Sequence, residues 1–257
     1  MKDDRGFTYS ELMIVVVIVA SLAAVAVPNV LRSRMAASEA EVVAQLRRVA
    51  VQEGIYKTSL ETDQDEDGIG EHGFLCELSG ELPPRKRKGF AEVPAAPVHP
   101  AYLPDALHTR GAGGDGTAAH SGYRFRLFLA ATCRCNDRPG DAMDDRGSGC
   151  RAGRWGEALD ATTDRPQINM QENSFCLYAW PDLSLAGGTR AFFVNELGRI
   201  RSTTMTVTPY LGKGRDVRDY RAAYSAAAQD GDGCWDDLLA EGEHNRGHDD
   251  NIWQPAG

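Results

Sequence analysis

An unbroken apolar segment near the start of the chain is followed by an amphipathic one. From Leu12 to Val27 there are sixteen residues without a charge. Counted from Phe7, the apolar segment has 21 residues. At ~1.5 Å rise per residue it forms about 31 Å of helix, enough to cross a bilayer core of roughly 30 Å. Lys2 and Arg5 precede it, so the positive-inside bias keeps that end in the cytoplasm.

The amphipathic segment after Pro28 predicts that the helix continues. No Gly or further Pro occurs before Gly54, and apolar residues recur at helical spacing. These residues are Leu31, Met35, Val42, Leu46, Val49 and Tyr56. We expect one helix over 7–60, kinked near Pro28 because the ring removes a backbone hydrogen bond. Its single apolar stripe should pack on a head formed by 61–257.

Period-two alternation predicts strands between 123 and 204. In YRFRLFLA, Tyr123, Phe125, Leu127 and Leu129 share one face. The segments SFCLYAW and TRAFFVNELGRIRST supply two or three more strands, with a hairpin turn at Gly198. We therefore predict an α+β fold in which the long helix packs on an antiparallel sheet of three or four strands.

Other parts of the head are predicted to be irregular. Residues 80–122 hold six of the twelve prolines and seven glycines, and form an arm that contains the basic run 85–88. That run suits either a DNA or lipid contact or a solvated loop, and the acidic remainder favours the loop. Residues 134–173 are poor in aliphatics and are interpreted as an insertion between strands. Residues 205–257 are expected to hold a short helix and an acidic tail.

Composition and charge narrow the function. Hydrophobic residues make up 42% and charged residues 25%, which excludes a mostly disordered chain or a polytopic membrane protein. The net charge is −9, and 229–257 hold eight acids and one Arg. Nucleic acid is not an expected partner, because phosphate binding needs a positive surface. Without a nucleophile elbow, a phosphate-binding loop or an H-E-x-x-H motif, we expect no enzymatic activity.

The junction between the charged leader and the apolar segment carries a family resemblance. MKDDRG followed by FTYSE, with Gly6, Phe7, Glu11 and Pro28 in place, resembles the signal of type IV prepilins and type II secretion pseudopilins. Tyr9-Ser10 departs from the commoner Leu-Ile or Leu-Val. The resemblance implies that prepilin peptidase removes leader 1–6 and methylates the Phe7 amine. A secretory signal peptide cleaved near Ala24-Val25-Ala26 is the alternative.

The resemblance implies a structural subunit of a pilus or pseudopilus. The chain would be single-pass in the inner membrane with a periplasmic head, and would then join a filament with itself and other pilins. A platform protein and an assembly ATPase are implied partners. An ionised carboxylate at membrane depth costs ~2.5–3.5 kcal/mol, so we expect Glu11 to pair with a neighbouring subunit's Phe7 amine.

Two alternatives to this function stay open. The first is a minor pilin or pseudopilin whose arm or insertion displays an adhesive or ligand-binding surface. The second, more distant, is a secreted calcium-binding enzyme. Methyl-Phe7 at the mature N-terminus would support a filament subunit, whereas Val27 would support a secreted protein.

An acidic segment follows the long helix. Asp63, Asp65 and Asp67 alternate before Gly68, as at the opening of an EF-hand loop, and Glu71 follows. Phe74 occupies the position of the usual bidentate Glu, so Glu71 would have to replace it. We interpret the segment as a Ca2+ site, with a solvated acidic turn as the alternative. A weaker candidate comprises Asp230, Asp232, Asp236 and Asp237.

Six cysteines form an even set that fits disulfides in an exported chain. Fifteen pairings are possible. Our preferred set is Cys133–Cys176, Cys135–Cys150 and Cys76–Cys234. A zinc site is disfavoured in an exported chain. We interpret His244 and His248 as surface residues rather than metal ligands.

Overall fold

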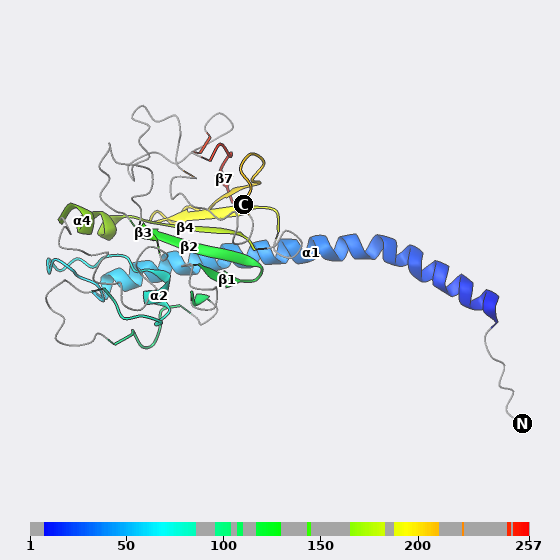
Figure 1. Ribbon diagram of the computed structural model, residues 1–257, viewed down its shortest axis with the longest axis horizontal. Helices are drawn as coiled ribbons and strands as arrows, with labels where there is room; N and C mark the ends of the chain where they lie inside the picture. The colour runs from blue at the N-terminus through cyan, green and yellow to red at the C-terminus, as the bar shows by residue number, and fades with distance from the viewer. Residues whose placement is uncertain are drawn as a thin grey trace, which may run out of the picture.

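The computed structural model combines one long helix with an antiparallel sheet, which confirms the predicted α+β class (Figure 1). It describes residues 8–85, 96–103, 107–109, 117–129, 143–144, 165–182, 188–210, 223, 246–247 and 249–256. The helices are α1 (Tyr9–Thr58), α2 (Leu75–Leu78) and α4 (Arg165–Asn173). The strands are β1 (Ala118–His120), β2 (Tyr123–Leu129), β3 (Met143–Asp144), β4 (Phe175–Pro181), β5 (Ala191–Asn195), β6 (Arg201–Thr203) and β7 (Gln254–Pro255).

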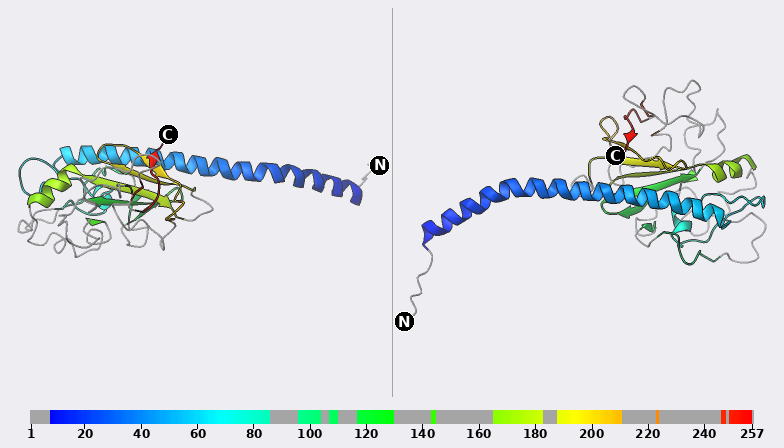
Figure 2. Two further views of the ribbon diagram at one scale, coloured as in Figure 1. Left: turned by 90° about the horizontal axis from the view of Figure 1, so that it is seen from above. Right: turned by 180° about the vertical axis from the view of Figure 1, so that it is seen from behind.

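Helix α1 is continuous over 50 residues and contains Pro28. It begins in a capping box, in which Thr8 and Glu11 exchange hydrogen bonds, and ends at Thr58, after which the Ser59 N–H donates to the carbonyl of Ile55. The helix bends gradually in its N-terminal half as it leaves the head (Figures 1 and 2). The proline is therefore accommodated inside one helix, close to the predicted extent of 7–60.

The C-terminal half of α1 packs on the sheet. Val42, Leu46, Val49 and Tyr56 are fully buried and join a core with the inward-facing strand residues. Leu31, which belongs to the same predicted stripe, is exposed. The stripe is thus buried only where the head reaches it, and α1 projects beyond the head as a rod (Figure 1).

The sheet is larger than predicted. Strands β1-β2-β4-β5-β6-β7 run side by side, and β3 adds a seventh strand on β2. The longest pairing joins β2 to β4 over seven residues, with Leu127 opposite Leu177. The extra strands are of two or three residues, too short for alternation to reveal them. β3 and α4 also give regular structure to parts of the predicted insertion 134–173.

Both faces of the central strands are buried. Tyr123, Phe125, Leu127 and Leu129 face the α1 core, as the alternation predicts. The opposite face carries a second cluster of aromatic residues around Trp253. The hairpin between β5 and β6 also forms as predicted, with Gly198 at φ +68° donating to the Asn195 carbonyl at 2.8 Å.

Candidate functional site

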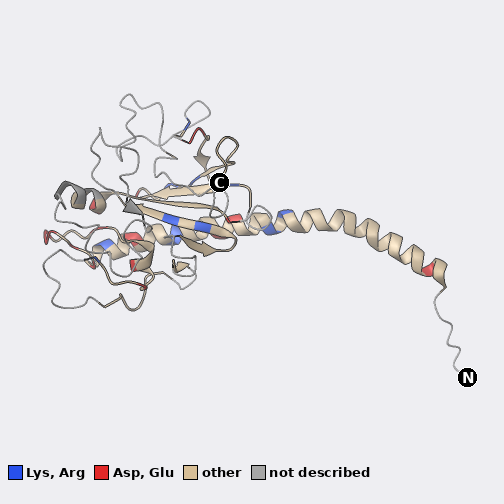
Figure 3. Ribbon diagram, in the orientation of Figure 1, with Lys and Arg blue, Asp and Glu red and all other residues tan. Residues whose placement is uncertain are grey.

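The N-terminal half of α1 is an exposed apolar surface. An 18-residue stretch has a mean hydropathy of 2.6, and none of it is buried. Val17, Leu22 and Val25 are each about two-thirds exposed. Figure 3 shows a long part of this half without charged residues. Within the described part of the chain, α1 is the one helix long and apolar enough to span a membrane.

Glu11 lies at the first turn of this apolar surface. One carboxylate oxygen, Oε2, accepts hydrogen bonds from the Thr8 N–H and the Thr8 hydroxyl, both at 2.8 Å. The capping box therefore fixes the carboxylate at the helix N-terminus and leaves Oε1 for a further donor. Gly6 and Phe7, the residues of the predicted cleavage, lie outside the described residues.

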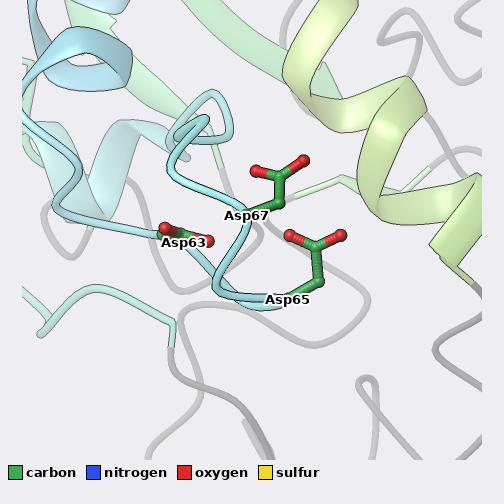
Figure 4. A group of neighbouring side chains, drawn as sticks. All are labelled: Asp63, Asp65 and Asp67. Atoms are coloured by element: carbon green, nitrogen blue, oxygen red, sulfur yellow. The ribbon is translucent and has the colours of Figure 1, made fainter.

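The acidic loop after α1 brings the three predicted aspartates together. One carboxylate oxygen each from Asp63, Asp65 and Asp67 lies within 4.8 Å of the other two (Figure 4). Asp63 also accepts the Gly68 N–H at 3.1 Å, and Asp67 accepts the Ile69 N–H at 2.8 Å. These bonds fold the loop back on itself and explain why the alternating carboxylates converge.

Glu71, the fourth predicted ligand, is buried within the same loop. Its Oε1 accepts the Gln64 N–H at 2.9 Å, and its own N–H donates to the Thr62 carbonyl. Burial raises the pKa of its carboxyl group, although the Arg85 charge opposes this rise. Among the described residues, Glu71 Oε2 has no hydrogen-bond partner.

Glu172, in the last turn of α4, is an acidic neighbour that the sequence analysis missed. It is 4% exposed. Burial, together with the charges of Asp67, Asp65 and Glu71, raises its pKa to about 7. Lys57 Nζ donates to the Glu172 carbonyl oxygen at 2.6 Å and holds this turn of α4 beside the end of α1. A lone Glu about a hundred residues away carried no signal that would have linked it to the loop.

Arg85 corrects the prediction that the basic run is a solvated loop. Its guanidinium is buried, with Nε 3.1 Å from Glu77 Oε1 and Nη1 donating to Gln171 Oε1 at 2.8 Å. Nη2 donates to the His72 carbonyl, and the group lies 4.7 Å from the Phe74 ring centroid. Arg85 is thus an internal counter-charge for Glu77, and 86–88 lie outside the described residues.

The described cysteines lie on opposite faces of the sheet. Cys76 belongs to the α1-facing core, whereas Cys176 on β4 belongs to the opposite cluster and is in register with Phe128. No disulfide joins two described cysteines. Each preferred pairing includes a residue outside the described part and stays a prediction. The residues outside it are Cys133, Cys135, Cys150, Cys234, His244, His248 and the second acidic group, Asp230, Asp232, Asp236 and Asp237.

Comparisons with known proteins add no assignment. No family model matches the chain, and no curated protein or solved structure does either.

Proposed function

We propose that the protein is a type IV pilin-like structural subunit that is anchored in the inner membrane and assembles through α1 into a pilus or pseudopilus. The observation that carries this proposal is the exposed, apolar N-terminal half of α1, which projects away from the head (Figure 3). The prepilin-like residues around Gly6 and Phe7 support the same proposal, because they would direct cleavage just before this apolar segment.

The apolar half of α1 must be shielded from water. Apolar surface in water costs roughly 25 cal/mol per Å² relative to buried surface, and side chains here are exposed on all sides of the helix. Lipid shields this surface before assembly, and the same segment of neighbouring subunits shields it in a filament. The head packs only on the C-terminal half of α1, so both arrangements leave it outside the apolar layer.

Glu11 gives the assembly a defined axial position. Removal of 1–6 would create an amine on Phe7, next to the Thr8 that already binds Glu11 Oε2. In a filament, Glu11 of one subunit would accept the Phe7 amine of its neighbour through Oε1. An ionised carboxylate is costly inside an apolar bundle, so this pairing favours one stagger of the helices over others.

The mature N-terminus tests the proposal. The full chain would be expressed in cells with active prepilin peptidase and in matched cells with inactive peptidase, and the purified protein analysed by intact mass and N-terminal sequencing. We expect N-methyl-Phe7 only with the active enzyme. A mature protein that begins after the apolar segment, near Val27, would overturn the proposal. So would an unprocessed chain in both strains.

Filament incorporation is the second test. Sheared filaments are separated from membranes, and each fraction is probed for the chain. We expect the processed protein in the filament fraction, and a chain that stays in the membrane fraction beside assembled wild-type pilins would contradict the proposed role.

A further inference from the structure

We infer that the acidic loop and α4 together form a Ca2+ site, in which Glu172 joins Asp63, Asp65, Asp67 and Glu71. The site would cross-link the end of α1 to a segment about a hundred residues further along the chain. It is independent of the proposed filament role, because Ca2+ binding is measured on the isolated chain.

The spacing of the loop carboxylates fits a Ca2+ ion. Ca2+ takes six to eight oxygen ligands at about 2.3–2.6 Å, so any two ligands lie at most about 5 Å apart. The oxygens of Asp63, Asp65 and Asp67 lie within 4.8 Å of one another. Glu71 and Glu172 lie outside this group, so each would reach the ion by a side-chain rotation or through a bridging water. Figure 4 shows the side chains of Asp65 and Asp67 on the side of the loop where α4 passes.

Buried oxygens without donors are the independent observation. Within the described residues, Glu172 Oε1 and Glu71 Oε2 are shielded from solvent and accept no hydrogen bond. The same holds for Asp63 Oδ1 and Asp65 Oδ1. A buried carboxylate oxygen without a donor or cation is strongly unfavourable. Two of these four oxygens belong to the aspartate group and two lie on its neighbours, and a hard cation bound there would compensate all four negative side chains.

The position of Glu172 is fixed by contacts outside the acidic group. Lys57 Nζ donates to its carbonyl oxygen at 2.6 Å, and the His72 N–H donates to the Gln171 carbonyl at 3.0 Å. The Arg85 guanidinium also donates a hydrogen bond to the Gln171 side chain. The loop and α4 are therefore attached on both sides of the acidic group, and Glu172 is held beside it.

The ligand chemistry favours Ca2+ over other metals. All five side chains are carboxylates, a set that suits hard cations rather than the nitrogen and sulfur sites of transition metals. Mg2+ needs near-ideal octahedral geometry at about 2.0–2.1 Å and usually retains several waters. Four carboxylates on a folded-back loop and a fifth on α4 better match the larger, more variable Ca2+ shell. Asp67 is exposed, so water can complete that shell.

Calorimetric titration of the full chain in detergent micelles tests the site. After chelator treatment and exchange into chelator-free buffer, CaCl2 is titrated into the wild type and into Glu172→Gln, Asp65→Asn and Glu66→Gln. Glu66 is exposed in the same loop, so Glu66→Gln removes an equal charge without removing a proposed ligand. MgCl2 is titrated in parallel.

We expect one saturable Ca2+ site in the wild type, weakened about tenfold or more by Glu172→Gln and by Asp65→Asn, and changed little by Glu66→Gln. Thermal unfolding with and without Ca2+ provides a second measurement, which does not depend on the heat of binding. Without Ca2+, Glu172→Gln should unfold at a higher temperature than the wild type because it removes a repelling buried charge. With Ca2+, it should lose the wild-type shift.

Three results would overturn the inference. They are the absence of saturable Ca2+ binding in the folded wild type, equal weakening by Glu66→Gln, and binding that Glu172→Gln leaves unchanged. Tighter binding of Mg2+ than of Ca2+ would also refute the assignment of the ion.

Discussion

Arg85→Met removes the counter-charge of a buried carboxylate while keeping an apolar side chain against Phe74. Glu77 is fully buried, and burial raises its pKa while the Arg85 charge opposes the rise. Breaking a buried ion pair by removing one partner typically costs about 3–5 kcal/mol. Glu77 still accepts the Phe74 N–H at 2.7 Å and the residue-85 N–H at 2.8 Å. We therefore expect the lower end, about 3 kcal/mol.

Urea unfolding of the full chain in detergent, followed by fluorescence of the buried Trp180 and Trp253, measures this loss. The corresponding fall in melting temperature is about 6–12 °C for a protein of this size. Arg47→Met, at an exposed position on α1, is the matched control and should stay within about 0.5 kcal/mol of wild type.

A double-mutant cycle separates the ion pair from general packing. Glu77→Gln keeps an acceptor for the Phe74 N–H but removes the charge that Arg85 compensates. The double variant Glu77→Gln/Arg85→Met should therefore be more stable than Arg85→Met alone. Strictly additive losses, or an Arg85→Met variant as stable as the Arg47→Met control, would refute the reasoning.

Three further predictions address the loop and the helix. In chelator, the folded Glu172 pKa of about 7 lies above its ordinary 4.5, so the folded state holds an extra proton between these values and stability falls as pH rises through them. Burial also raises the pKa of Glu71 and Glu77, so the test is a difference. After allowance for solvent screening, the fall measured by urea unfolding should be about 1–2 kcal/mol larger in the wild type than in Glu172→Gln. Gly70→Ala would place a Cβ 2.3 Å from the Lys57 carbonyl oxygen and should cost about 1–3 kcal/mol by thermal unfolding, whereas Gly54→Ala, with open space and helical backbone, should stabilise by about 0.5–1 kcal/mol. Glu11→Gln retains a capping side chain but loses the charge, so it should enter sheared filaments as poorly as Glu11→Ala; normal incorporation would exclude a charge-based stagger.

The elements with strong periodicity could be predicted from the sequence. The alternation in 123–129 gave the buried face of β2 correctly, since β2 has to place every second side chain against α1. Gly198 marked the hairpin because its φ of +68° favours glycine. The length of α1 followed from an uninterrupted helical pattern, and Pro28 did not break it. These are local signals, which depend on neighbours in the chain.

The predictions that failed depend on contacts between distant segments. Arg85 stands in a run of basic residues, and its burial follows from Glu77 on α2 and Gln171 on α4, which no local pattern reveals. Glu172 lies near the acidic loop only because α4 packs beside the end of α1. The sequence could identify Asp63, Asp65 and Asp67 as one group, since they share a short loop. It could not show that Glu172 lies near this group, because the two are about a hundred residues apart in the chain.

The continuity of α1 has a mechanical consequence. A tensile force on the projecting end has no flexible joint to absorb it, because the helix runs unbroken from Tyr9 to Thr58. The pull enters the head at Glu39, whose carboxylate lies 2.7 Å from the Arg190 guanidinium, and then passes along the buried residues of α1. Resistance of the head to being pulled apart is therefore shared along the whole packed half of the helix, and the Lys57–Glu172 contact at its far end bears the load last.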